Sequence, residues 1–258
     1  MPRFAANLSM MFNDAPFLER FGRAASAGFK GVEYLFPYDY APAELAERLS
    51  EHGLSQVLFN LPPGDFAAGE RGIAALPGRE AEFRESVDRA VEYAQVLACP
   101  KLHAMAGLVS DESQRPRMHE VYLENLRYAA QRLAEHDMRL LIEPINTRSI
   151  PGYFINLQSE GHAILAELGE SNVQVQMDFF HAQVMEGDLA ACFKRFQAGV
   201  GHIQIAGVPD RHEPDSGEVN YPYLFAMLDE AGYDGWIGCE YIPRDLTEDG
   251  LDWLAPWR

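Results

Sequence analysis

The sequence has few cysteines and no long apolar stretch, and both absences exclude classes of protein. Its three cysteines, Cys99, Cys192 and Cys239, are too few and too scattered for a disulfide framework or a zinc site. No run of 18 apolar residues occurs, so we expect no membrane span. The first residues lack the long apolar segment of a signal peptide. We therefore expect a reducing, cytoplasmic location.

Basic residues are also scarce. The chain has 21 Lys and Arg against 39 Asp and Glu, which gives a formal charge of −18. This charge argues against a nucleic-acid partner, because nucleic-acid phosphates are bound by surfaces rich in Lys and Arg. The glycine-rich residues 64–70 do not follow a phosphate-loop pattern, and sequence order reveals no Ser-His-Asp or Cys-His arrangement. None of these features indicates an oligomeric state.

Segments typical of strands and of helices alternate along the whole chain. We expect strands over residues 4–8, 31–34, 56–60, 101–105, 139–143, 173–178, 200–206 and 235–241. We expect helices over residues 15–27, 42–52, 79–98, 112–136, 158–169, 186–197, 221–231 and 246–256. Eight such units without a linker predict an α/β fold, a single (β/α)8 TIM barrel that spans 1–258 as one domain.

Four of the expected strands end in a polar residue: Glu143, Asp178, Gln204 and Glu240. They are spaced by roughly one βα unit of about 30 residues, and in such barrels the carboxyl ends of the strands meet at the mouth that holds the active site. Three carboxylates and an amide at that mouth predict a site for a hard divalent cation. A neutral amide ligand favours Mg²⁺ or Mn²⁺ over zinc.

The alternation within residues 173–178 supports this orientation. Val173, Val175 and Met177 would face the helices, while Gln174, Gln176 and Asp178 would point into the barrel. The alternative is an edge strand with one solvated face. Two long segments, residues 60–78 and 207–218, follow strands and would overhang the mouth as lids or binding loops.

Glu143 and Glu240 are the candidate acid–base pair. Their strands lie well apart around the barrel, so the two carboxylates would flank a substrate, one removing a proton and the other returning it. A metal between them would polarise a carbonyl or hydroxyl oxygen. The alternative is that each glutamate merely pairs with Lys or Arg inside the barrel.

Further polar residues are candidates for substrate binding. His181 would contact substrate hydroxyls or act as an acid, unless it is a surface or capping histidine. Arg211, in the second long loop, would bind a substrate carboxylate, unless it is an ordinary exposed arginine. Asn7 ends the first strand and is a further candidate. Asn60, Lys101 and His103 would line the floor.

Several motifs together resemble the hydroxypyruvate isomerase family, within the xylose isomerase-like TIM-barrel superfamily. They are residues 4–10 (FAANLSM), 36–38 (FPY), 63–65 (PGD), 76–80 (LPGRE), 201–206 (GHIQIA), 217–221 (GEVNY) and 235–241 (GWIGCEY). Residues 1–4 (MPRF) and 209–215 (PDRHEPD) are similar to the 2-oxo-tetronate isomerase branch. The resemblance covers essentially the whole chain.

The resemblance implies that Glu143 and Glu240 are the proton donor and acceptor, and that Glu143, Asp178, Gln204 and Glu240 bind a divalent metal. It implies isomerisation of a short oxo-acid through a cis-enediol(ate): 2-oxo-tetronate to 3-oxo-tetronate, or hydroxypyruvate to tartronate semialdehyde. Sugar isomerases and epimerases of the superfamily carry histidine where this chain has Gln204, so a strict requirement for metal does not follow.

Three other functions remain open at this point. A carbohydrate 3-epimerase would share the barrel and the glutamate pair but would accept neutral ketohexoses. A non-catalytic sugar- or acid-binding protein would bind ligand without exchanging its α-proton. A metal-dependent endonuclease would need more histidine ligands and a basic face, which the charge of −18 opposes.

Overall fold

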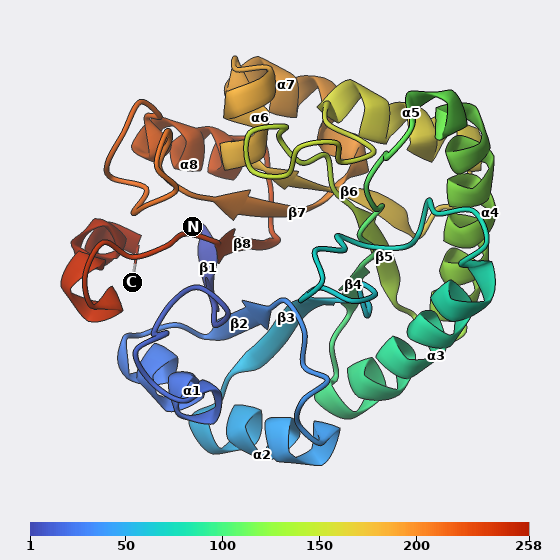
Figure 1. The fold of residues 1–258 in the computed structure, drawn as a ribbon. Helices are drawn as coiled ribbons and strands as arrows, with labels where there is room; N and C mark the ends of the chain where they lie inside the picture. The colour runs from blue at the N-terminus through green and yellow to red at the C-terminus, as the bar shows by residue number, and fades with distance from the viewer. Residues whose placement is uncertain (258) are drawn as a thin grey trace.

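Eight parallel strands close into a barrel in the computed structural model, which describes residues 1–257 (Figure 1). They follow chain order, and β8 pairs with β1 to close the ring. The strands are β1 (Arg3–Asn7), β2 (Gly31–Tyr34), β3 (Ser55–Asn60), β4 (Lys101–His103), β5 (Arg139–Ile142), β6 (Val173–Asp178), β7 (Val200–Ile205) and β8 (Trp236–Cys239). The predicted α/β barrel is confirmed over the described residues, and the last residue of its predicted span, Arg258, lies outside them.

Helices surround the barrel (Figure 1). The α-helices are α1 (Phe17–Ser26), α2 (Pro42–His52), α3 (Glu80–Leu97), α4 (Arg115–Ala134), α5 (Gln158–Leu168), α6 (Phe179–Met185), α7 (Leu189–Phe196) and α8 (Tyr221–Glu230). Short 3-10 helices are η1 (Glu112–Gln114), η2 (Gln197–Gly199), η3 (Thr247–Gly250) and η4 (Asp252–Trp257). Gly53 and Gly169 take left-handed conformations directly after α2 and α5, as glycines that end helices commonly do.

The structure differs from two of the expected helices. The helix expected over 186–197 is present as α7 (Leu189–Phe196), and it is preceded by a helix that was not expected, α6, which begins directly after β6 because Asp178 both ends the strand and caps the helix. The Asp178 Oδ1 accepts the Phe180 N–H at 2.7 Å. The α-helix expected over 246–256 is instead the pair η3 and η4, with Gly250 ending the first and Pro256 inside the second. Both residues disfavour a continuous α-helix.

The barrel interior is polar where it approaches the mouth. On β6, Val175 and Met177 are fully buried in the core, as predicted, while Gln176 and Asp178 are buried polar residues. On β8, Gly238 leaves room for a buried carboxylate, because a Cβ there would lie 2.4 Å from the Glu33 Oε1. A polar group inside a barrel must find partners, since leaving it unpaired is costly.

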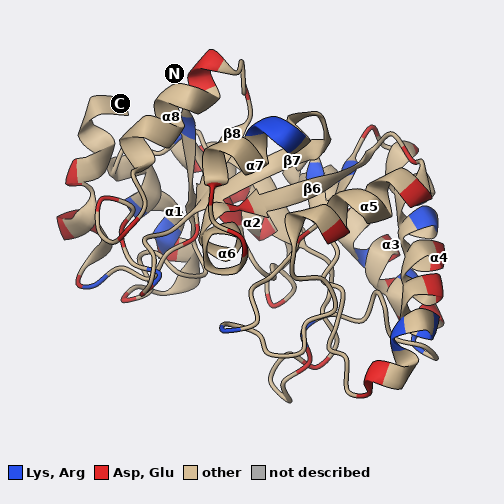
Figure 2. Cartoon of the chain, turned by 90° about the horizontal axis from the view of Figure 1, so that it is seen from above, with Lys and Arg blue, Asp and Glu red and all other residues tan. Residues whose placement is uncertain are grey.

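The outer surface mixes charges of both signs. Figure 2 shows acidic and basic residues interspersed along α3 and α4, where Arg84 pairs with Glu124 at 3.2 Å and Arg132 with Asp88 at 2.8 Å. Within residues 1–257, no helix is long and apolar enough to cross a membrane.

Candidate active site

A cavity of about 140 Å³ lies at the carboxyl ends of the strands. Glu143, His181, Arg211 and Glu240 line it, together with residues of the first long loop. A larger groove of about 650 Å³ lies outside the barrel between α4 and α5, lined by residues such as Arg115, Phe154 and Ile164. The smaller cavity is the candidate active site, because the buried ionisable groups of Glu143, Asp178, His181 and Glu240 converge there.

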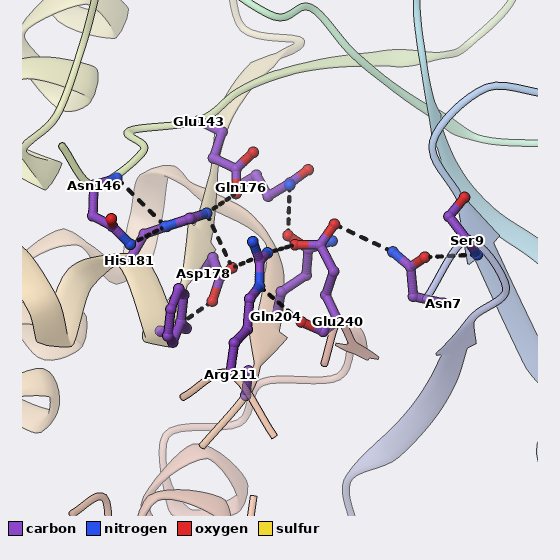
Figure 3. Close-up of polar contacts among 12 residues, drawn as sticks. Asn7, Ser9, Glu143, Asn146, Gln176, Asp178, His181, Gln204, Arg211 and Glu240 are labelled. Carbon is purple, nitrogen blue, oxygen red and sulfur yellow. Dashed lines mark hydrogen bonds and ion pairs between the residues drawn. The ribbon is translucent and has the colours of Figure 1, made fainter. Parts of the chain in front are cut away.

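Three of the four predicted strand-end residues meet in this cavity. Ligand atoms of Glu143, Asp178, His181 and Glu240 all lie within 4.8 Å of one another. Each side chain is at least nine-tenths buried. They come from the ends of β5, β6 and β8 and from α6, so segments far apart in sequence supply one cluster (Figure 3). The structure thus brings together the three carboxylates that the sequence pattern pointed to.

Gln204, the fourth predicted ligand, is engaged at both ends of its amide. Its Nε2 donates to the Glu33 Oε1 at 2.7 Å, and its Oε1 accepts from the Gln176 Nε2 at 2.6 Å. Because Glu33 offers only acceptors when ionised, it orients the amide with the nitrogen toward itself and the oxygen away. His181 joins the three carboxylates in the cluster, and the role of Gln204 as a metal ligand stays a prediction.

Glu33 is a hub beneath the cavity that sequence reasoning missed. Its carboxylate accepts from Asn7, Gln204 and His202, at 3.2, 2.7 and 2.7 Å. The Asn7 Nδ2 also lies 3.3 Å from the Glu240 Oε1, and its Oδ1 accepts the Ser9 N–H at 3.0 Å (Figure 3). Asn7, predicted to bind substrate, therefore links Glu33 to Glu240.

His181 presents an N–H group to the cavity. The Asn146 Nδ2 lies 2.6 Å from the His181 Nδ1, and the Asn146 backbone N–H donates to the same nitrogen at 3.4 Å. The Asn146 Oδ1 accepts the Ser149 N–H at 2.6 Å, which assigns the Nδ2 to the imidazole. A Nδ1 that accepts these donors is unprotonated, so in the neutral ring the proton is on Nε2.

The neutral form of His181 is favoured by its surroundings. Burial, with the positive charge of Arg211, lowers the pKa of His181 well below its usual value. Its Nε2 lies 3.5 Å from the Asp178 Oδ2 and 3.9 Å from the Glu143 Oε1. His181 is therefore a hydrogen-bond donor at the cluster rather than a lone-pair ligand.

Arg211 is not an exposed loop arginine. Its Nη2 contacts the Glu240 Oε2 directly and lies 3.5 Å from the Asp178 Oδ2, and its Nε donates to the Glu240 carbonyl oxygen at 3.2 Å. The guanidinium also lies 5.0 Å from the centre of the Phe180 ring. Figure 3 shows this side chain reaching between the two carboxylates. Arg211 thus supplies a positive charge inside the cluster.

The two glutamates have raised pKa values. Burial raises the pKa of Glu143 well above its ordinary value, and the charges of Glu240 and Asp178 raise it further. Burial raises the pKa of Glu240 to about 8, although Arg211 opposes the shift. The Glu143 Oε1 is buried and has no hydrogen-bond partner among the described residues. Burial thus favours the protonated form of both carboxyls.

Of the residues expected to line the floor, His103 and Asn60 line the cavity and Lys101 does not. The His103 Nδ1 lies 3.2 Å from the Asn60 Oδ1, and both residues line the cavity. The His103 Nε2 lies 3.8 Å from the Glu143 Oε2. Lys101 lies at the start of β4, where its Nζ donates to the Gly201 carbonyl oxygen at 2.6 Å, so it does not line the cavity.

Three further cavity residues lie away from the strand ends and were not named as site candidates. Gln176 precedes Asp178 by two on the same strand face, a spacing that the period-two pattern did indicate. Phe66 and Arg71 come from the long loop after β3, which was expected to overhang the mouth and does contribute to the cavity lining.

A closed parallel barrel with buried carboxylates at its strand ends is typical of TIM-barrel enzymes, which have their active sites at that mouth. The chain belongs to the xylose isomerase-like TIM barrel family, whose sequence profile matches residues 21–257.

Individual relatives are similar over their whole length. The 2-oxo-tetronate isomerase of Cupriavidus necator is 59% identical, covering 100% of this chain and 99% of that protein. The hydroxypyruvate isomerase of Escherichia coli is 46% identical and covers 100% of both. A solved structure described as an AP endonuclease, family 2, from Brucella melitensis superposes with a TM-score of 0.98 at 56% identity, covering 100% of both chains.

Proposed function

We propose that this protein is an isomerase of short oxo-acids, which interconverts 2-oxo-tetronate and 3-oxo-tetronate and performs the same reaction on hydroxypyruvate. Relatives at 46% to 59% identity over the full chain carry the names of these two activities. The observation that carries the proposal is the pair Glu143 and Glu240, two buried carboxyls with raised pKa values in one cavity. A cavity of about 140 Å³ suits a three- or four-carbon substrate, since sites for drug-sized ligands are roughly 300–1,000 Å³.

The reaction moves a carbonyl by one carbon. One glutamate carboxylate removes the proton from the hydroxyl-bearing carbon next to the carbonyl, and the electron pair forms the carbon–carbon double bond of an enediolate. The second glutamate, as its carboxylic acid, returns a proton to the former carbonyl carbon. A hydroxyl proton moves between the two oxygens, so the product is the isomer with the carbonyl displaced. The raised pKa values favour the acid that returns the proton, and the positive charge of Arg211, which opposes the shift in both glutamates, favours the carboxylate that removes it.

His181 stabilises the enediolate in this scheme. Its Nε2–H points to the same cluster as the two glutamates, and its neutral state makes it a donor that does not neutralise them. A neutral imidazole as the electrophile is an established device for enolisation. Asn146 holds the ring in that tautomer, and Asp178 accepts from the first turn of α6, which fixes the histidine beside it.

The donor set fits a hard divalent cation such as Mg²⁺ or Mn²⁺. Glu143, Asp178 and Glu240 would hold it, with the Gln204 Oε1 as a neutral ligand. The Glu143 Oε1 is buried and has no hydrogen-bond partner among the described residues, and a bound cation would provide one. When bound, the cation supplies Lewis-acid stabilisation of the substrate oxygens. Arg211 supplies part of the same positive charge from the chain itself, so the cation need not be strictly required.

Exchange of substrate protons with solvent deuterium tests the proposal. The purified protein is incubated in D₂O with 2-oxo-tetronate, hydroxypyruvate or a neutral ketohexose, with and without chelator, and the products are followed by NMR. We expect isomerisation and deuterium uptake with the oxo-acids. Binding of the oxo-acids without exchange would instead identify a binding protein, and faster turnover of the neutral ketohexose would identify an epimerase.

Variants of the glutamate pair sharpen this test. Glu143→Gln and Glu240→Gln should each lower the exchange rate by about 10² to 10⁴, the range for removing a general acid or base. Glu124→Gln, an exposed position on α4, makes the same chemical change away from the site. Retention of most activity by a folded Glu240→Gln variant would disprove the two-glutamate mechanism.

A further inference from the structure

The proposed substrate carries a carboxylate that the reaction leaves intact, and the reacting centre around it is acidic. Glu143, Asp178 and Glu240 would repel an anion, so productive binding requires a cation elsewhere in the cavity. Two basic side chains line the described cavity, Arg71 and Arg211. They are the two candidates among the cavity side chains for recognising the carboxylate.

Arg211 is already committed to protein carboxylates. It pairs with Glu240 and Asp178 and donates to the Glu240 backbone. Drawing this guanidinium toward a substrate carboxylate would leave two buried negative charges without a partner, which is strongly unfavourable. Because Glu240 and Asp178 retain Arg211, Arg71 is the cation available to the substrate carboxylate.

Arg71 has an unused edge. Its Nη1 donates to the carbonyl oxygens of Phe66 at 3.1 Å and Glu70 at 2.7 Å, and its guanidinium lies 4.0 Å from the centre of the Phe66 ring. Its Nε and Nη2 make no hydrogen bond, and no carboxylate lies within ion-pairing distance, among residues 1–257. An Arg edge with two parallel N–H groups matches a carboxylate.

The nearest carboxylate in sequence is kept away from Arg71. Glu70 pairs with Arg79, the Nη1 and Nη2 of which lie 2.7 and 3.3 Å from its oxygens, and Glu70 also accepts the Asp65 N–H at 2.6 Å. These contacts satisfy Glu70 on the outer side of the loop. The two arginines therefore have different partners: Arg79, at the start of α3, pairs with the Glu70 carboxylate, and Arg71, in the loop, is held by backbone carbonyl oxygens.

The backbone beside Arg71 is fixed. Gly72 has φ 101°, and a Cβ at this position would lie 2.1 Å from the Met105 carbonyl oxygen, so only glycine fits. The Gly72 N–H donates to the Pro63 carbonyl oxygen at 3.0 Å, and Gly72 bridges to Ala106. This anchors the loop against the segment that follows β4, with the Phe66 ring packed on Phe36 at 5.1 Å. Such anchoring reduces the entropy lost when a ligand is bound.

We propose that Arg71 binds the carboxylate of the substrate and thereby makes the site select oxo-acids over neutral ketoses. The assignment rests on the proposed function, since it presupposes an anionic substrate in this cavity. Arg71 acts at a group remote from the reacting carbons, so its contribution is mainly to substrate binding, and its loss raises KM more than it lowers kcat.

The test compares acids with neutral counterparts in which a hydroxymethyl group replaces the carboxylate. Hydroxypyruvate is matched with dihydroxyacetone, and 2-oxo-tetronate with erythrulose. For Arg71→Met we expect KM for the acids to rise by about 10- to 100-fold, the size of a lost charge-assisted hydrogen bond, with proton exchange into the neutral compounds unchanged. Arg71→Lys, which keeps the charge but not the fork, should be intermediate. Arg84→Met, on the outer face of α3, controls for the change in net charge.

The outcomes separate the two proposals. Wild-type protein that turns over neither acid disproves the proposed function itself. Wild-type turnover with an unchanged KM for the acids in Arg71→Met disproves the role of Arg71 and leaves the proposed function standing. If instead kcat for the acids collapses in Arg71→Met, with KM unchanged and a melting temperature well below that of wild type, then Arg71 merely supports the loop and the assignment is wrong.

Discussion

Asn146 directs two N–H groups at the same imidazole nitrogen of His181, the Nδ2 at 2.6 Å and the backbone N–H at 3.4 Å. This relationship sets the tautomer, because a nitrogen that receives two donors carries no proton of its own. It separates two roles that are open to a histidine beside three carboxylates. With the proton on Nε2, His181 would donate to substrate; with the proton on Nδ1, it would bind a metal.

Reversing the tautomer should exchange these roles. In Asn146→Asp the new carboxylate accepts from Nδ1–H, so Nε2 becomes a lone pair facing the cluster. We expect the rate of substrate proton exchange with solvent to fall by about 10²-fold, because the Nε2–H donor is lost. We expect the affinity for Mn²⁺ to increase, because the Nε2 lone pair becomes a ligand. Nitrogen-15 chemical shifts of His181 report the tautomer directly. A variant that loses activity while its Nε2 stays protonated would contradict the explanation, and Asn146→Ala controls for loss of the amide alone.

The pKa of Glu240 predicts a pH dependence of stability. Burial, opposed by Arg211, raises this pKa from 4.5 to about 8 in the folded state. A carboxyl with a raised folded pKa contributes stability that is fully present below its unfolded pKa and is lost as the pH rises through the folded pKa. Between pH 5 and 8, the free energy of unfolding of wild type should fall relative to Glu240→Gln by roughly 2 to 4 kcal/mol. Urea denaturation in chelator at both pH values checks this, and parallel pH profiles of the two proteins would refute it.

Glu33 should act through the residues that it orients. Glu33→Gln places an amide where three donors converge from Asn7, Gln204 and His202, so at least one of them loses its acceptor. We expect Mn²⁺ to bind about 10-fold more weakly, the usual result of disturbing a residue that orients a ligand. Electron paramagnetic resonance of free Mn²⁺ measures this without turnover. Unchanged Mn²⁺ affinity in a folded variant would show that the Gln204 amide is not a ligand.

The sequence pattern predicted the site residues that follow from the repeated βα unit. Each βα unit places a strand end at the same mouth, so Glu143, Asp178 and Glu240 were found from spacing alone. The interior of a four-residue strand offers no such signal: nothing in Gly31–Tyr34 tells that Glu33 faces a gap left by Gly238. Helix α6 was missed because Asp178 serves two elements at once.

Loop residues were the hardest to place. Arg211 was found as a cation, but its pairing with Glu240 depends on how a 12-residue segment folds back over the mouth, which no periodicity encodes. Arg71 carried no motif that separates it from Arg79, eight residues further on. The difference lies in Glu70, which reaches one arginine and not the other. Such choices are made by three-dimensional contacts rather than by local sequence.

Arg211 and a divalent cation should compete for the same carboxylates. The guanidinium holds Glu240 and Asp178, and a second positive charge at the cluster would be repelled by it. In Arg211→Met the three carboxylates are left without their internal cation, so the apo protein is destabilised and its affinity for Mg²⁺ or Mn²⁺ rises. A cation that binds only the folded state stabilises it in proportion to its affinity. Saturating Mn²⁺ should therefore raise the melting temperature of the variant by about 5 °C more than that of wild type. The comparison needs only thermal denaturation of both proteins, first in chelator and then across a Mn²⁺ titration. Equal shifts would mean that Arg211 and the cation occupy the cluster together, and the competition inferred from their shared carboxylates would be wrong.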